Sequence, residues 1–394
     1  MTSETPIVKI RPGKGRRFAE GAPWLFADEI AMDRRTKALE PGTLVRLIQA
    51  DRDCGIAAFN PQSRIAARVL DTDPIAKIDQ HWLSERLRKA QALRQRLFEA
   101  PFYRLVHAEG DSLPGVIVDR FGDAVVLQPN AAWADRMQEA LIGAISEVTG
   151  AKTIVVNATS RVRKLEGLDT GLHVHGPAPE GPIEVPMNGA VYLADLTGGQ
   201  KTGLYFDQRP NHAFAMAFAK NAKVLDVFSH VGGFGLAMLA GGAENVMAID
   251  SSAAALDLAK TASDRMGQAA KYRTQKSDAF NALENLAGES FDIVICDPPA
   301  FAPNKDAMAA GLRAYEKVAR LAAPLVAPGG VLGLCSCSHA VGTTSFHKAC
   351  VDGIRKAGRA GALIHAGRAG PDHPVHIGLP EGGYLKAHFF RLDG

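Results

Sequence analysis

The sequence lacks any apolar stretch long enough to cross a membrane and has few cysteines. No run within its 394 residues approaches the length of a membrane-spanning helix, which is about 18 to 20 residues. The first residues, MTSE, do not begin a signal peptide. The five cysteines are odd in number and scattered along the chain, which argues against a disulfide framework. We therefore expect a cytoplasmic protein with reduced thiols.

A strong excess of charge of either sign is also missing. The formal net charge is +3, with 22% charged and 46% apolar residues, values that are ordinary for a folded soluble protein. This charge is compatible with an anionic partner but does not identify one. A chain of 394 residues exceeds what one compact core usually contains, so we expect two or three domains.

Short strand-like segments separated by turn residues occupy residues 1–73. Such regular punctuation by Pro-Gly, Asp-Cys-Gly and Asn-Pro predicts a small β-barrel. Two groups of basic residues lie in it, one formed by Arg34, Arg35 and Lys37 and the other by Arg11, Lys14, Arg16 and Arg17. Taken alone, either group is more typical of a solvated surface than of a nucleic-acid contact.

Residues 74–182 have the pattern of a central α/β domain. A helix is predicted over about 79–99, because apolar residues recur at spacings of three and four: Trp82, Leu83, Leu87, Ala90, Leu93 and Leu97. Its other face has five cations: Arg86, Arg88, Lys89, Arg94 and Arg96. Strand-like segments at 103–108, 115–129 and 153–158 and a helix near 135–147 complete the domain. Nothing in it suggests catalysis, so we expect roles in spacing and substrate docking.

Residues 183–394 have a different pattern of predicted secondary structure. Asn188-Gly189 between two alternating segments predicts a two-residue hairpin turn. Strands and helices then alternate to the end of the chain, which predicts a doubly wound parallel sheet with right-handed crossovers. The closing segment 388–392 is expected to add a late strand to this sheet.

A glycine-containing turn, DVFSHVGGFG, follows the first strand of this sheet. Glycines there let the backbone approach a ligand, but the G-x-G-x-x-G spacing of a dinucleotide site is absent. Asp250 ends the next strand, where a carboxylate can accept both ribose hydroxyls, and Asp278 is placed to bind an adenine amino group. With no basic phosphate cradle, these carboxylates favour S-adenosylmethionine over NADP or ATP. Alternatively, Asp250 and Asp278 are N-caps of the following helices.

Reactive residues end two later strands of the same sheet. Asp297-Pro298-Pro299 follows one apolar run and Cys335–Ser338 follows the next. Because ligands bind at the carboxyl ends of parallel strands, both groups should lie at one cleft. A carboxylate, a rigid turn and a thiol together suggest nucleophilic catalysis on a flat ring. The Cys-x-Cys spacing lacks a second ligand pair, so we expect no metal site.

Several motifs in the same order resemble those of the large-subunit ribosomal RNA 5-methylcytosine methyltransferases. These are GGQKTGLYFDQRPNH (198–212), DVFSHVGGFG (226–235), CDPPAF (296–301), CSCSHA (335–340) and the closing DHPVHIGLPEGGYLKAHFFRL. The resemblance covers nearly the whole chain. It implies a PUA-like barrel, a central α/β domain and a C-terminal Rossmann-like class I methyltransferase domain. Ala22, His107 and Ala300 replace residues usual in the family, which puts substrate contacts in question more than the reaction.

The resemblance also implies roles for individual residues. Cys337, rather than Cys335, matches the nucleophile of the family. The cofactor, S-adenosylmethionine, would contact the glycine turn, the neighbouring strand ends and a loop before the first strand. The implied residues are Lys201, Tyr205, Asp207, Arg209, Asp226, Phe228, Ser229, Gly232, Gly233, Asp250, Asp278, Ala279 and Asp297.

The expected reaction is methylation of cytosine carbon 5 in large-subunit ribosomal RNA. A Cys337 thiolate adds to carbon 6, and Asp297 hydrogen-bonds or protonates ring nitrogen 3. The target base must leave its stack, so the basic residues Arg11, Lys14, Arg16 and Arg17 and the arginine-rich helix become candidate RNA contacts. Methylation of an RNA nitrogen, a non-catalytic assembly factor and a small-molecule methyltransferase are the alternatives. A homodimer is left open.

Overall fold

The computed structural model describes residues 5–198 and 203–393, which fold into two compact units. Within these residues, the first unit comprises 5–181, 196–198 and 371–380, and the second 182–195, 203–370 and 381–393. The division of the chain into three domains at residues 73 and 182 stays a prediction. No helix in the described residues combines the length and apolar character needed to span a bilayer.

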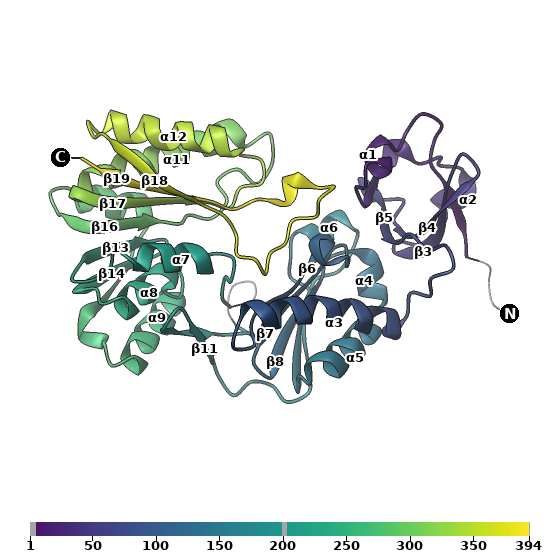
Figure 1. Ribbon diagram of the computed structural model, residues 1–394, viewed down its shortest axis with the longest axis horizontal. Coiled ribbons are helices and arrows are strands. Elements are labelled where there is room, and N and C mark those ends of the chain that lie inside the picture. Colours follow the sequence, from purple (N-terminus) through teal and green to yellow (C-terminus); the bar gives the residue numbers. More distant parts are fainter. Residues whose placement is uncertain (1–4, 199–202, 394) are drawn as a thin grey trace. The chain divides into compact units, whose positions relative to one another are not determined.

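The first unit contains two sheets and their helices (Figure 1). Its elements are β1 (Ile7–Lys9), α1 (Arg16–Ala19), β2 (Trp24–Phe26), α2 (Arg34–Lys37), β3 (Thr43–Gln49), β4 (Arg52–Phe59), β5 (Ile65–Asp71), α3 (Gln80–Leu97), β6 (Phe102–His107), β7 (Val116–Phe121), β8 (Ala124–Pro129), α4 (Ala132–Arg136), α5 (Gln138–Thr149), β9 (Thr153–Asn157), α6 (Val162–Leu165) and β10 (Leu172–His175).

The second unit contains a hairpin and one large sheet. Its elements are β11 (Ile183–Met187), β12 (Ala190–Ala194), α7 (Arg209–Met216), β13 (Lys223–Val227), α8 (Gly233–Ala240), β14 (Asn245–Asp250), α9 (Ala253–Arg265), β15 (Tyr272–Lys276), α10 (Ala279–Asn285), β16 (Phe291–Cys296), α11 (Met308–Ala322), β17 (Val326–Ser336), α12 (Thr343–Lys356), β18 (Gly361–Gly367) and β19 (Lys386–Leu392).

The N-terminal sheet has the order β1-β3-β4-β5-β2. β1 pairs with β3 in parallel, and the other neighbours are antiparallel. Its fully buried side chains include Val8, Leu25, Val45, Leu47 and Phe59. The predicted strands are all present. β2 is an additional strand, and its three residues are too few to show a strand pattern in the sequence.

The central sheet has the order β10-β9-β8-β7-β6, and α3 and α5 share a core with it. Two details of the predicted helix are wrong. Leu93 and Leu97 are 42% and 43% exposed, whereas Arg94 is fully buried. Arg94 continues the three- and four-residue spacing of Leu87 and Ala90, so it occupies the buried stripe. Burial is possible because both its terminal nitrogens donate to the Asp111 carboxylate, at 2.6 and 2.7 Å.

Glu166 forms a buried polar centre between the barrel and the central sheet. It is 3% exposed and accepts hydrogen bonds from Arg68 at 2.9 Å, Ser63 Oγ at 2.7 Å and Asn60 Nδ2 at 3.2 Å. A buried carboxylate needs several donors to offset its lost hydration. The three donors all come from strand β5 or the turn before it, so Glu166 fixes the barrel to the segment after β9.

The second unit confirms the predicted hairpin and alternating elements. Asn188 and Gly189 both have positive φ, 54° and 73°, as a type I′ turn requires. The large sheet has the order β15-β14-β13-β16-β17-β19-β18. Its first five strands run parallel, and β19 pairs antiparallel with both β17 and β18. The sheet is therefore doubly wound but mixed at its late-strand edge.

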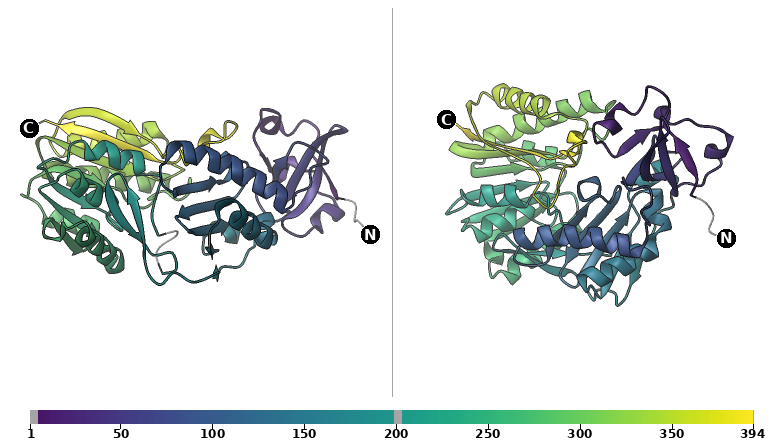
Figure 2. Two further views of the ribbon diagram at one scale, coloured as in Figure 1. Left: turned by 60° about the horizontal axis from the view of Figure 1, so that its bottom comes forward. Right: turned by 45° about the vertical axis from the view of Figure 1, so that its right-hand side comes forward.

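Helices cover both faces of this sheet. Successive side chains of β19 point to opposite faces and contact different helices there. The ring of Phe389 contacts Phe214 of α7 and Phe234 of α8, with centroids 5.0 and 6.4 Å apart. Its neighbours His388 and Phe390 instead contact rings on α12. α11 and α12 lie along that second face (Figure 2), where they form a core with α10 and the central strands. The central strands of the sheet are thus buried on both faces and offer their carboxyl ends for ligands.

We expect Glu166→Gln to destabilise the first unit. The substitution leaves the Arg68 guanidinium, whose side chain is 11% exposed, without its buried counter-ion, which costs about 3 kcal/mol. Urea unfolding followed by fluorescence measures the change. Glu85→Gln, which removes an exposed ion pair with Arg88, is the control and should change stability by under about 1 kcal/mol. Equal stabilities of the two variants would contradict the role of Glu166.

Candidate active site

The predicted site residues of the second unit follow consecutive strands at one edge of the sheet. Asp278 follows β15, Asp250 ends β14, Asp226 lies in β13, Asp297 follows β16 and Cys337 follows β17. These five strands are parallel neighbours in this order, so their carboxyl ends lie side by side. Strand order reverses between β13 and β16, the position at which open α/β sheets bind ligands.

The loop between β13 and α8 has a constrained backbone. Phe228 and His230 have φ of 63° and 49°, and Gly232 has φ of 85°. Left-handed conformations at two non-glycine residues are costly and persist only where surrounding contacts impose them. Here Ser229 N donates to Ile249 O at 3.0 Å, and His230 N donates to Asp250 Oδ2 at 2.9 Å. The Asp250 carboxylate therefore holds the loop in place.

Asp226 connects the end of β13 to the start of α8. Its Oδ2 accepts a hydrogen bond from Gly235 N at 2.7 Å. A Cβ at Gly235 would lie 3.1 Å from the same oxygen, so glycine allows this close approach. Burial, with the charges of Asp297 and Asp250 adding to it, raises the pKa of Asp226 to about 8. A buried, hydrogen-bonded carboxyl group thus lies at the centre of the strand ends.

Two buried polar atoms at this strand end indicate whether the site suits S-adenosylmethionine. Asp226 Oδ1 and Ser229 Oγ have no hydrogen-bond partner among the described residues. Buried polar atoms in native proteins are normally paired, so these atoms indicate a polar ligand or ordered water. The amides at the start of α8, Gly232 N and Gly233 N, donate to Ser229 O at 2.8 and 3.3 Å and so hold the loop against the helix. The residues therefore fit the nucleoside part of such a cofactor, with Asp250 beside it for ribose hydroxyls.

The alternative interpretation as helix caps holds for one carboxylate and not the other. Asp278 is the N-cap of α10, and its Oδ1 accepts from Asn281 N at 3.0 Å. The N-cap of α9 is Ser252 rather than Asp250. Asp250 instead accepts from His230 N and from Ser252 N, the latter at 2.8 Å. Binding of the cofactor by Asp250, Asp278 and the adjacent Ala279 stays a prediction.

Gln208 is a site residue that the sequence pattern does not single out. It is 3% exposed, and its Nε2 donates to Asp297 Oδ2 at 2.9 Å. Its Oε1 accepts from Asn211 Nδ2 at 2.6 Å, which fixes the amide. Gln208 therefore orients the Asp297 carboxylate. The one available signal was its place between Asp207 and Arg209 in the motif preceding the first strand.

Three predicted residues lie in the segment from 203 to 209. The Tyr205 ring lies 5.2 Å from that of His230, beside the β13–α8 loop. Asp207 is 8% exposed, and its Oδ2 accepts from Tyr384 OH at 2.5 Å. Arg209 begins α7. Lys201 lies outside the described residues.

The cysteines differ in burial, and this difference separates Cys337 from the other cysteines of the second unit. Cys296, Cys335 and Cys350 are buried, whereas Cys337 is half-buried. Burial, together with the neighbouring Asp297, raises the pKa of the Cys335 thiol well above its usual range. Because the thiolate is the nucleophilic form, Cys335 is a poor nucleophile. The accessible thiol at this sheet edge is that of Cys337.

A network of hydroxyl groups fixes the turn that contains Cys337. Ser336 Oγ and Tyr315 OH are 2.9 Å apart, and Tyr315 OH and Ser338 Oγ are 2.7 Å apart. Ser338 Oγ also accepts from Ala302 N at 3.1 Å, just after the diproline segment. The two reactive turns are therefore connected directly, which limits their relative movement.

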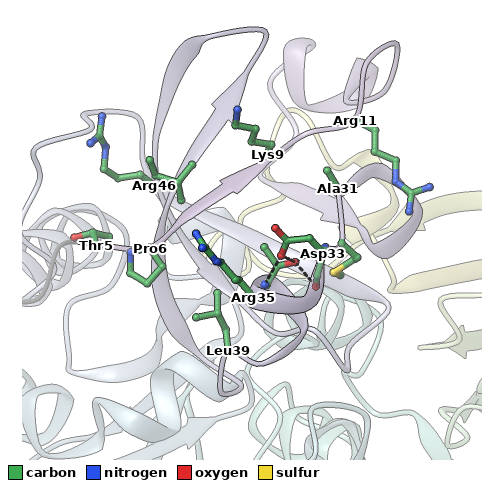
Figure 3. Close-up of a pocket in the computed structure, with 12 residues that line it drawn as sticks. Thr5, Pro6, Lys9, Arg11, Ala31, Asp33, Arg35, Leu39 and Arg46 are labelled. Atoms are coloured by element: carbon green, nitrogen blue, oxygen red, sulfur yellow. Dashed lines mark hydrogen bonds between the residues drawn. The ribbon is translucent and has the colours of Figure 1, made fainter.

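The RNA-binding residues predicted from the sequence lie in the first unit. A groove of about 750 Å³ beside β1 and α2 is lined by the cations Lys9, Arg11, Arg35 and Arg46 and by Asp33, among others (Figure 3). Of the four predicted residues, Arg11 alone lines this groove. Lys14 and Arg16 form ion pairs with Asp28 and Glu20, and Arg17 is outside the groove lining.

Two protein-family models match the chain. One, described as S-adenosylmethionine-dependent methyltransferase, matches residues 172–358, and the other, described as PUA-like domain, matches residues 8–72. These matches confirm the predicted fold class and identify S-adenosylmethionine as the cofactor.

Curated relatives match over nearly full length. A protein of Aliivibrio fischeri (strain ATCC 700601 / ES114), named ribosomal RNA large subunit methyltransferase I, is 36% identical over 98% of this chain and 100% of its own. A protein of the same name from Tolumonas auensis is 36% identical over 98% of each chain. Such identity over whole chains shows common family membership.

Solved structures share the fold. SMU.776 complexed with SAH has a TM-score of 0.83 at 19% identity, covering 98% of this chain and 99% of its own. Trm5b from Pyrococcus abyssi has a TM-score of 0.53 at 16% identity, covering 70% of this chain and 75% of its own.

We expect Asp250→Asn to weaken binding of S-adenosylhomocysteine about tenfold or more, because a hydrogen bond to a charged group contributes about 1.5 to 3 kcal/mol. The amide oxygen still accepts from one loop amide, so the fold should persist. Titration calorimetry measures the change. The control is Asp257→Asn on the exposed side of α9, which should bind like the native protein. An unchanged Kd for Asp250→Asn would argue against ribose binding there.

Proposed function

The chain belongs to the family of ribosomal RNA large subunit methyltransferase I, and from this premise we propose that it forms 5-methylcytosine in large-subunit ribosomal RNA. S-adenosylmethionine supplies an electrophilic methyl group. The family supports the methyl transfer and the class of RNA. The choice of cytosine carbon 5 rests on the residues of this chain.

The accessible thiol of Cys337, which follows the strand paired with the one before Asp297, is the observation that carries the proposal. β16 and β17 are paired neighbours, and the residues that follow them are joined through Ser338 and Ala302. Gln208 holds the carboxylate, and the hydroxyl network holds the turn with the thiol. A positioned nucleophile and a positioned polar partner are what addition to a pyrimidine ring requires.

In the proposed reaction, Cys337 Sγ bonds to carbon 6 of the cytosine ring. The electron pair of the carbon 5–carbon 6 double bond becomes available at carbon 5, which then bonds to the methyl group as the methyl–sulfur bond of the donor breaks and leaves S-adenosylhomocysteine. Loss of the carbon 5 proton to a base restores the double bond and expels the thiolate. Each bond formed with sulfur is broken again, so Cys337 is regenerated after each turnover.

Asp297 is proposed to bind ring nitrogen 3. Addition of the thiolate increases electron density at this nitrogen, so a protonated or hydrogen-bonded partner stabilises the transition state. Asp297 is near Asp226 and Cys335, whose pKa values it raises. The negative charges of these neighbouring groups favour protonation of one of the clustered carboxyl groups.

Methylation of a ring or exocyclic nitrogen has less support. That reaction needs no thiol and usually places an aromatic residue directly after the diproline, to stack on the base. Here Ala300 occupies that position. Phe301 packs inward, with its ring 4.9 Å from that of Tyr315 and 6.1 Å from that of Phe280.

We expect native protein, incubated with S-adenosylmethionine and RNA containing 5-fluorocytidine, to form an adduct that survives a denaturing gel. Fluorine replaces the carbon 5 proton, so the final elimination cannot occur and the sulfur–carbon bond persists. Cys337→Ala should form none. Cys335→Ala, two residues away, is the matched control and should retain the adduct. RNA that accepts methyl groups but forms no adduct with native protein would favour nitrogen methylation instead.

The basic groove of the PUA-like barrel is proposed to bind the RNA backbone. Lys9 and Arg35 are exposed and line the groove with Arg11, whereas Arg46 pairs with Asp53. Exposed cations in a groove attract phosphates and release counterions on binding. The fully buried Arg94 is corrected from a candidate RNA contact to a structural residue, because its guanidinium is paired inside the first unit.

We expect Lys9→Ala combined with Arg35→Ala to weaken RNA binding on the order of tenfold. The slope of log K against log salt should fall by about 1.4 to 1.8, since each lost phosphate contact contributes about 0.7 to 0.9. Filter binding at several salt concentrations measures both values. A double substitution of Lys220 and Lys271, which are exposed in the second unit, is the charge-matched control. Equal slopes for the two variants would exclude the groove as the contact.

A further inference from the structure

Lys386 is a buried cation next to the reactive turn. It begins β19 and is 5% exposed. In the antiparallel pairing of β19 with β17, it is opposite Ser336, the residue before Cys337. Burying a lysine is costly unless its charge is used or compensated, so its position requires an explanation.

The ammonium group of Lys386 binds the backbone just after Cys337. Its Nζ donates to Ser338 O at 2.7 Å and to Val341 O at 2.9 Å. In the described residues, 5–198 and 203–393, it forms no salt bridge with a carboxylate. Two carbonyl oxygens therefore use two of its three donors, and no carboxylate of these residues neutralises its charge.

The charge of Lys386 interacts with the Cys337 thiol. Burial lowers the pKa of Lys386 to about 8, and the charge of Cys337 opposes this shift. Other titratable groups also interact with one member of the pair: His339 in the turn and His388 on β19 with Lys386, and Tyr315 on α11 with Cys337. Burial lowers the pKa of both histidines, and the charge of Lys386 lowers them further. Lys386 is therefore the cation in this group near neutral pH.

We propose that Lys386 is a positioning residue that stabilises the thiolate of Cys337 and so sets the reactivity of this cysteine. The inference rests on the proposed function, in which Cys337 is the nucleophile. When the thiol ionises, its proton passes to solvent, and the ammonium group stays protonated beside the sulfur. A neighbouring cation favours the charged form of a thiol. The same ammonium holds the carbonyl groups of the turn and so fixes the distance between charge and sulfur.

The start of α12 is a weaker candidate for this role. α12 begins at Thr343 with Gly342 as N-cap, so the turn Ser338–Val341 separates it from Cys337. The macrodipole acts mainly within the first turn of a helix. Lys386 instead donates to the carbonyl of the residue directly after Cys337, which places a full charge next to the reactive turn.

The test is the pH dependence of Cys337 alkylation in the full-length protein without RNA. Iodoacetamide is used in a Cys335→Ala background, and the peptide with Cys337 is quantified by mass spectrometry. We expect a midpoint below the usual thiol value of about 8.5. Lys386→Met should raise the midpoint by about one unit, which slows alkylation near pH 7 about tenfold. Lys386→Arg keeps the charge and should restore most of the rate.

Cys54, in the first unit, serves as an internal control and should alkylate alike in all variants. A folded Lys386→Met protein with an unchanged Cys337 midpoint would overturn the proposal. If Lys386→Met does not fold, the midpoint of the protein with native Lys386 decides: a value at or above about 8.5 overturns it. The readout needs no RNA, so failure of the 5-fluorocytidine adduct with a lowered midpoint would reject the proposed reaction and leave the role of Lys386 intact.

Discussion

The parallel pairing of β13 with β14 and β16 is the constraint on which the rest of the second unit depends. Hydrogen bonds fix Asp226 opposite Ala248 on one side and Ile295 on the other. Because the strands run in one direction, each chain segment leaves the sheet at the same edge. Strand direction alone therefore brings residues that are far apart in sequence to one site.

The position of each strand divides this edge into two halves. β13, β14 and β15 present the constrained loop and three aspartates, Asp226, Asp250 and Asp278, which suit a nucleoside. β16 and β17 present the carboxylate and the thiol, which suit a ring to be modified. The reversal of strand order between β13 and β16 brings the halves together, and the proposed reaction places the methyl donor on one side and the acceptor base on the other.

Buried charges recur in both units, each compensated differently. Glu166 is surrounded by donors from the barrel, and Arg94 is paired with Asp111. Lys386 has backbone carbonyls and a thiol instead. The first two follow the general rule that buried ions are paired. The third leaves its charge available to act on a reactive neighbour.

The sequence by itself determined the elements and the candidate residues of the second unit. The hairpin at Asn188-Gly189 was predictable because both positions need positive φ, and the strands were predictable from their apolar runs and regular alternation. Asp297 and Cys337 were predictable as neighbours, because consecutive parallel strands end at one edge. Interpreting Arg94 as exposed was wrong, since spacing alone cannot show that a distant carboxylate pairs with a charge in a buried stripe.

Only the tertiary structure decided which side chains support the reactive groups. Gln208 meets Asp297 across 89 positions of sequence, and Lys386 meets the turn after Cys337 across 48. No local pattern encodes such contacts, because they depend on antiparallel register and on loop paths. The sequence thus specified the reactive groups through strand order, whereas the burial, orientation and charge around them came from packing between distant segments.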